Sequence, residues 1–134
     1  MVSPRRVVVV VFDGIQTLDV SGPVEVFSTA NRESGSPLYK IELVSSDGQA
    51  ATGTSGLSLN VDRSIAEVRG EIDTLLVAGG GGVAEAVADT HLVAGVARLA
   101  KKARRVTSGC SGAFVLAEAG LLDGKRCTTH WSAC

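Results

Sequence analysis

The most informative segment of the chain reads Arg105-Val-Thr-Ser-Gly-Cys110-Ser-Gly-Ala-Phe-Val-Leu-Ala-Glu-Ala-Gly120. A β-rich run ends at Cys110, and an apolar helix follows it at once. At such a strand-to-helix turn the side chain is held at the carboxyl end of the sheet, where open α/β folds bind ligands. The N-terminal end of the helix would favour the thiolate. We therefore expect Cys110 to be a nucleophile on an elbow; the alternative is a buried free cysteine that acts as a small apolar side chain.

The patterns on either side of this stretch predict an α/β domain. Apolar or β-branched runs predict strands at 6–12, 38–44, 73–78 and 105–108, and short extended pieces between 50 and 61 predict a hairpin flap. We expect helices from Asp19 or Ser21, as N-cap, to about residue 31, from 90 to 103, and from 111 to 119. Alternating strands and helices imply a parallel sheet with right-handed crossovers.

Four glycines, 79 to 82, follow the third long strand directly. The backbone can bend freely there and expose N–H groups. The run is either a flexible connection or an amide nest for an anion or oxyanion, and the pattern leaves both open.

The composition excludes several classes of protein. The 134 residues suit one domain, and a net charge of -1 gives no electrostatic footprint for nucleic acid. The apolar run from Val7 to Phe12 is far shorter than the roughly 20 residues of a membrane span, and no signal peptide is recognisable. Three cysteines without a CxxC pair indicate neither a disulfide framework nor a zinc site. We expect a cytoplasmic protein without a metal or cofactor.

Three segments resemble a known family. They are Val-Val-Val-Phe-Asp-Gly-Ile-Gln-Thr-Leu-Asp-Val-Ser-Gly-Pro-Val-Glu-Val-Phe (9–27), Ile-Asp-Thr-Leu-Leu-Val-Ala-Gly-Gly (72–80), and the stretch from Val106 to Trp131. They are similar to the ThiJ/PfpI group of the class I glutamine amidotransferase-like superfamily, which implies a flavodoxin-like parallel sheet flanked by helices with a nucleophile elbow. The patterns most resemble the N-terminal domains of AraC-type transcriptional regulators, and isonitrile hydratases come second.

The resemblance assigns roles to particular residues. Cys110 matches the reactive elbow cysteine, and Asp19 matches the acid that sits against the sulfur in hydratase-like members. His130 belongs to a family motif, Thr-Thr-His-Trp, and is a possible site residue that we read first as structural. Ser111 stands where proteases of the superfamily place a histidine, which argues against a Cys-His pair. The expected oxyanion or ligand-binding positions are Gly79, Gly80, Gly81 and Ser111.

The resemblance implies that residues 1–134 form a small-molecule-sensing ThiJ/PfpI-like domain of an AraC-type regulator. The family domain normally continues beyond this point, so we expect a domain incomplete at its C-terminus. We also expect a homodimer, an unknown small-molecule ligand, no membrane partner, and DNA binding only through a domain absent from this chain. The alternative is a cysteine-dependent hydratase resembling isonitrile hydratase. A redox sensor that oxidises Cys110 reversibly stays open as well.

Overall fold

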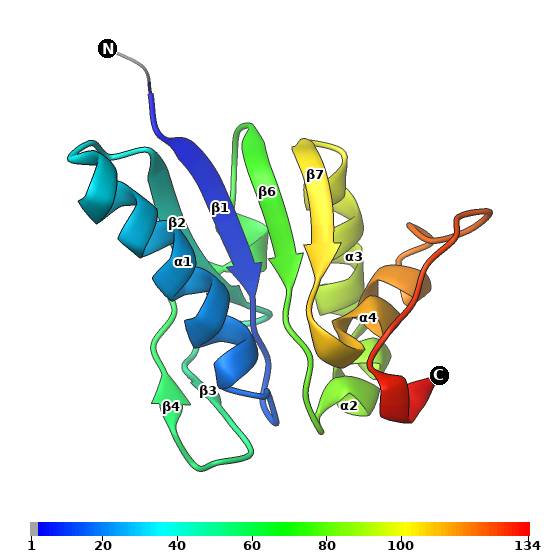
Figure 1. The fold of residues 1–134 in the computed structure, drawn as a ribbon. Coiled ribbons are helices and arrows are strands. Elements are labelled where there is room, and N and C mark those ends of the chain that lie inside the picture. Colours follow the sequence, from blue (N-terminus) through cyan, green and yellow to red (C-terminus); the bar gives the residue numbers. More distant parts are fainter. Residues whose placement is uncertain (1–2) are drawn as a thin grey trace.

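The computed structural model describes residues 3–134 (Figure 1). Its strands and helices, in chain order, are β1 (Arg5–Val10), α1 (Leu18–Ser34), β2 (Tyr39–Ser45), β3 (Ala51–Thr52), β4 (Ser58–Leu59), β5 (Arg63–Ser64), β6 (Ile72–Val77), α2 (Val83–Ala88), α3 (Thr90–Ala100), β7 (Ala103–Ser108) and α4 (Ala113–Glu118). Single 3₁₀ turns cover Ile65–Glu67, Cys110–Gly112 and Trp131–Ala133.

The main sheet is parallel and has the strand order β5-β2-β1-β6-β7. Helix α1 covers one face, and α2, α3 and α4 cover the other (Figure 1). This is the flavodoxin-like α/β arrangement that the sequence predicts. Strands β3 and β4 form a separate antiparallel hairpin, the predicted flap.

Strand β1 lies at the centre because its valines are buried on both faces. Val8 and Val10 pack toward α2, α3 and α4, whereas Val7 and Val9 pack toward α1, and all four are fully buried. Successive side chains of a strand point to opposite faces, so an unbroken apolar run suits a strand with helices on both sides.

All five strands of the sheet run in the same direction, so the segments that follow β1, β6 and β7 meet at its carboxyl edge. From β1 the chain moves outward through β2 to β5 and then returns to β6 and β7 on the other side. The order reverses between β1 and β6, and such a reversal is where open α/β sheets leave a crevice for ligands.

The predicted N-cap of the first helix is wrong. Helix α1 begins at Leu18 with Thr17 as its N-cap, so Asp19 and Ser21 lie inside the first turn. The Asp19 carboxylate instead accepts a hydrogen bond from a backbone amide 60 residues away. This tertiary contact takes the place of the local cap that the sequence favours.

Two elements were not predicted, and two helices have different ends. Helix α2 follows the glycine run, where only a loop was expected, since six residues are too few to show helical periodicity. Strand β5 has only two residues. Helix α3 ends at Ala100 because Ala103 already pairs with Ile72 in the sheet. The last predicted helix is a 3₁₀ turn followed by the six-residue α4.

Within residues 3–134, no helix is both long enough and apolar enough to cross a membrane.

A buried carboxylate ties the amino-terminal half of the sheet together. Glu42 of β2 is 2% exposed, and it accepts a hydrogen bond from Arg6 of the neighbouring strand β1. The Nε atom of Arg63 lies 3.2 Å from Glu42 Oε2 without hydrogen-bond geometry, so it contributes charge alone. Burial raises the pKa of Glu42, but the hydrogen bond from Arg6 and the positive charges around it outweigh burial and lower it.

The variant Glu42→Gln should lower the free energy of unfolding by about 3 kcal/mol at pH 7, because two guanidinium groups lose a buried counter-charge. A lowered folded-state pKa means that the carboxylate stabilises the protein above its ordinary pKa, 4.5, and stops doing so as the pH falls through the folded-state value. Urea unfolding should therefore show the two proteins converging below pH 4.5.

The control is Glu33→Gln, which removes an exposed carboxylate 4.0 Å from Arg32. It should change stability by less than about 0.5 kcal/mol. A Glu42→Gln deficit that stays constant from pH 7 to pH 3 would contradict the assigned role.

Candidate functional site

Cys110 sits on a strained turn between β7 and α4. Its φ is 50°, and it is the one residue other than glycine with a positive φ among residues 3–134. For an L-residue this conformation costs about 1–2 kcal/mol and persists only where the surroundings enforce it. The side chain is half-buried. The predicted elbow geometry is therefore present in the backbone.

The helix behind the elbow is shorter than the sequence predicts. A single 3₁₀ turn, Cys110–Gly112, precedes α4, which has six residues. A short helix aligns few peptide dipoles, so less positive potential reaches the sulfur than a helix from 111 to 119 would provide.

Asp19 lies beside the elbow, although it comes from the first turn of α1. Its Oδ2 atom accepts a hydrogen bond from the Gly79 amide, with N and O 3.3 Å apart. A Cβ placed on Gly109, the residue before Cys110, would lie 3.9 Å from the same oxygen. The fold therefore brings together Asp19 from the start of α1, Gly79 from the loop after β6, and the elbow after β7.

The first two glycines of the run are required by close backbone contacts. A Cβ on Gly79 would lie 2.5 Å from the Ser111 nitrogen, and one on Gly80 would lie 2.4 Å from the Gln16 nitrogen. Gly80 also has a φ of 147°, which side-chain-bearing residues rarely adopt. The loop after β6 is thus packed between the elbow and the loop after β1.

Ser111 connects the elbow to the glycine run. Its buried hydroxyl accepts a hydrogen bond from the Gly80 amide at 3.1 Å and donates to the Gly80 carbonyl at 3.3 Å. Since the Gly79 amide donates to Asp19, both of these predicted oxyanion donors have partners within the protein. Gly81 is exposed, and a Cβ there would lie 3.4 Å from Thr54 of the hairpin.

His130 is held by its own turn. Its Nδ1 atom accepts the Ser132 amide at 3.2 Å and lies 2.7 Å from the Ser132 hydroxyl, so the ring caps the last 3₁₀ turn. The hydroxyl of the preceding residue, Thr129, donates to the Cys110 carbonyl at 3.1 Å and fastens this segment to the elbow. Among the described residues, no hydrogen bond joins His130 to Cys110.

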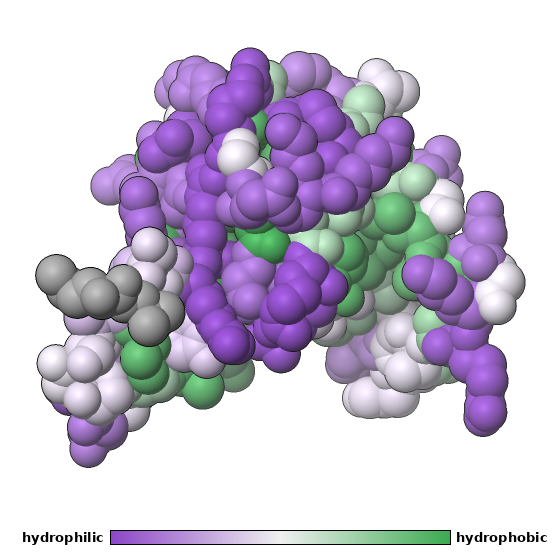
Figure 2. All heavy atoms as spheres, turned by 90° about the horizontal axis from the view of Figure 1, so that it is seen from above, coloured by the Kyte–Doolittle hydropathy of each residue, from purple (hydrophilic) through white to green (hydrophobic). Residues whose placement is uncertain are grey.

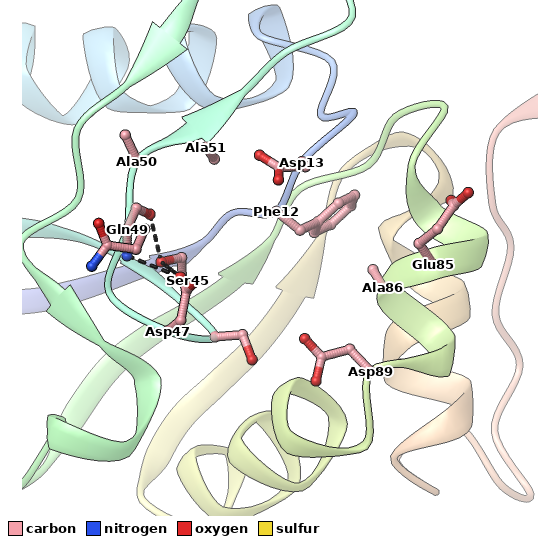
Figure 3. Close-up of a pocket in the computed structure, with 11 residues that line it drawn as sticks. Phe12, Asp13, Ser45, Asp47, Gln49, Ala50, Ala51, Glu85, Ala86 and Asp89 are labelled. Carbon is pink, nitrogen blue, oxygen red and sulfur yellow. Dashed lines mark hydrogen bonds between the residues drawn. The ribbon is translucent and has the colours of Figure 1, made fainter.

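A cavity that the sequence reading missed opens at the same edge of the sheet (Figure 3). It measures about 300 Å³, with Phe12 and Asp13 between Asp47 on one wall and Glu85 on α2 on the other. Asp13 accepts the Thr52 amide, and Asp47 accepts the Gln49 amide. The sequence does place a carboxylate shortly after each of two strands, Asp13 after β1 and Asp47 after β2, and this pattern could have predicted the cavity. Within residues 3–134, no three acidic, cysteine or histidine side chains are grouped so as to hold a metal ion.

Residues 5–134 match the DJ-1/PfpI family. An uncharacterized protein in the cpoL 5′ region of Streptomyces lividans is 46% identical over 128 residues, which are 96% of this chain and 89% of that protein. Isonitrile hydratase of Pseudomonas putida is 36% identical over 121 residues, or 90% of this chain and 50% of the enzyme. The helix-turn-helix regulator GbdR of Pseudomonas aeruginosa is 31% identical over 129 residues, or 96% of this chain and 35% of the regulator.

A solved structure of a protein from the same family has a similar fold. The crystal structure of a ThiJ/PfpI family protein from Pseudomonas syringae superposes with a TM-score of 0.83 at 28% identity, covering 97% of this chain and 52% of that one. The chain thus spans about half the length of the hydratase and of this neighbour, and about a third of the regulator. The elbow, the parallel sheet and these matches together show that the chain belongs to the DJ-1/PfpI family.

Proposed function

We propose that this domain senses a small molecule for an AraC-type transcriptional regulator. Its ligand would bind at the carboxyl edge, beside Cys110 and Asp19, and DNA would be bound by a separate domain. GbdR, of which this chain spans 35%, is a helix-turn-helix regulator, and other relatives of the same kind are 33% identical.

The observation that carries the proposal is the internal pairing of two of the site's amides, those of Gly79 and Gly80. An oxyanion hole accelerates a reaction only if its donors are free to point at the developing charge. Here the Gly79 amide donates to Asp19, and the Gly80 amide donates to Ser111. A ligand would have to exchange with these partners, and such an exchange moves the Asp19 and Ser111 side chains. Binding coupled to side-chain movement suits a sensor better than a preorganised catalyst.

The proposed homodimer has a surface that suits it. Leu18 and Val26 are 70% and 68% exposed, and they lie eight residues apart on the outer side of α1. Gly22, midway between them, has open space where a side chain would be. A second copy packed along this stripe would remove two large apolar side chains from water.

Hydration of an isonitrile is the second candidate, and the elbow itself favours it. The Cys110 sulfur would add to the terminal carbon of the isonitrile while Asp19 delivers a proton to that carbon, forming a thioimidate. Water would then add to the same carbon and expel the thiol, leaving an N-substituted formamide and the unchanged cysteine. This route needs a cysteine on a turn near a carboxyl group, and Cys110 is half-buried on a strained turn directly after Gly109, where a Cβ would lie 3.9 Å from Asp19 Oδ2.

Turnover separates the two functions. With excess n-butyl isocyanide, we expect less than one formamide per chain after several hours, measured by proton NMR, because the Gly79 and Gly80 amides are occupied. Repeated turnover that disappears in Cys110→Ala but persists in Cys127→Ala would establish the hydratase instead. Cys127 is the matched control because it is also a free thiol, and it is exposed.

Removing the Ser111 hydroxyl should free the Gly80 amide. We expect Ser111→Ala to raise acylation of Cys110 by p-nitrophenyl acetate about tenfold, since that reaction develops an oxyanion. Alkylation by iodoacetamide, which develops none, should change less than twofold. Both rates are measured in a background with Cys127 and Cys134 changed to serine.

Ser108→Ala is the control for the comparison between the acylation rate and the alkylation rate. Ser108 ends β7, and its side chain makes no hydrogen bond to any part of the chain that the structure describes. It should leave both rates unchanged. If Ser111→Ala leaves acylation unchanged or lowers it, Ser111 does not hold the amide back.

A further inference from the structure

Positive charge gathers at the amino edge of the sheet, opposite Cys110. The chain has 13 lysines and arginines, and eight lie at the starts of β1, β2, β6 and β7 or in the turns that lead into them. These eight are Arg5, Arg6, Lys40, Arg69, Lys101, Lys102, Arg104 and Arg105. Seen from above, this edge is predominantly hydrophilic (Figure 2). The net charge of -1 conceals the asymmetry because many carboxylates lie elsewhere.

Part of this edge is hollowed into a cleft of about 440 Å³. The cleft is formed by the start of β1, the start of β6 and the turn between α3 and β7. Two acidic residues, Glu71 and Asp73, line it. Its basic lining residues are Arg5, Arg6, Lys101, Lys102 and Arg104.

Two of the five cations are held in place by partners. Arg6 donates to buried Glu42 and to the Arg69 carbonyl. Arg104 donates twice to Asp73, at 2.7 and 3.3 Å, and this hydrogen bonding lowers the pKa of Asp73 to about 2. These contacts fix the positions of both guanidinium groups in the wall of the cleft.

The other three cations are available to a ligand. Arg5, Lys101 and Lys102 are exposed and make no ion pair within residues 3–134. Lys101 and Lys102 follow the C-terminal end of α3, and the helix dipole accounts for lysines there because cations stabilise the negative end of a helix. The dipole does not explain Arg5, which lies on β1, two strands away from β7. Arg5 from β1 therefore meets Lys101 and Lys102 from the turn before β7, and the three unpaired cations leave a local excess of positive charge.

We infer that this cleft binds an anion that carries several phosphate charges. Guanidinium groups match phosphate oxygens with paired donors, and lysine ammonium groups add compact charge. A single carboxylate could not reach cations that lie on β1, on β7 and in the turn before β7, whereas a polyphosphate or a phosphodiester chain could. The cleft is separate from the Cys110 edge, because a six-residue strand spans about 20 Å. The inference therefore stands or falls independently of the proposed sensor function.

An anion with several phosphate charges could be a free polyphosphate-bearing molecule or the backbone of DNA. Two probes distinguish these sources. Inorganic tripolyphosphate is titrated by calorimetry, and a fluorescein-labelled 20-base-pair duplex of arbitrary sequence is titrated by anisotropy. Binding of tripolyphosphate alone would support a small anion. Duplex binding displaced by tripolyphosphate, with a slope of log K against log salt of about −2 to −3, would support DNA phosphates contacting three cations.

The variant Arg5→Ala/Lys102→Ala should weaken whichever probe binds by at least tenfold in 20 mM NaCl. The matched control, Lys125→Ala/Arg126→Ala, also removes one lysine and one arginine, outside this cleft, and should change affinity less than twofold. All four side chains are exposed, so the thermal midpoints should stay unchanged. The inference is overturned if neither probe binds in 20 mM NaCl, or if the two variants weaken binding equally.

Discussion

The carboxyl edge of this domain depends on backbone packed directly against backbone. The loop after β6 passes so close to the elbow and to the loop after β1 that no side chain fits at Gly79 or Gly80. Because the three loops touch through main-chain atoms, they hold Cys110 in a conformation that an isolated turn would not keep. The hydrogen bonds of Asp19 and Ser111 to the same glycines complete this junction.

This packing has a chemical consequence. A buried amide needs a partner, and the junction supplies one from within the protein for the Gly79 amide and one for the Gly80 amide. The site is therefore stable without a ligand, but any ligand that uses these donors must replace a carboxylate or a hydroxyl. Cys110 is half-buried and lies beside that exchange, so binding and thiol reactivity can influence each other. Catalysis that uses these amides as an oxyanion hole would likewise require them to be released first.

The parallel topology also places acidic and basic side chains at opposite edges of the sheet. Helices α1, α2 and α3 begin at the carboxyl edge, where Asp19, Glu85 and Asp89 lie in first turns or at an N-cap. Helix α3 ends at the amino edge, where Lys101 and Lys102 follow it. Negative side chains suit helix starts and positive ones suit helix ends, so an almost neutral chain becomes polarised along its strands. The two edges consequently differ in charge.

Several features follow from the sequence by itself. The buried run from Val7 to Phe12 has six residues and the strand-Cys110-helix pattern from 105 to 120 has sixteen, so local patterning is enough to predict a central strand, an elbow and a parallel sheet. The partners of the site are not local. Asp19 meets Gly79 across 60 residues, and Ser111 meets Gly80 across 31. Arg5 and Lys102 share a cleft although they lie far apart in the sequence. Only the tertiary structure decided these contacts, because pairing of distant parallel strands determines which loops and charges become neighbours.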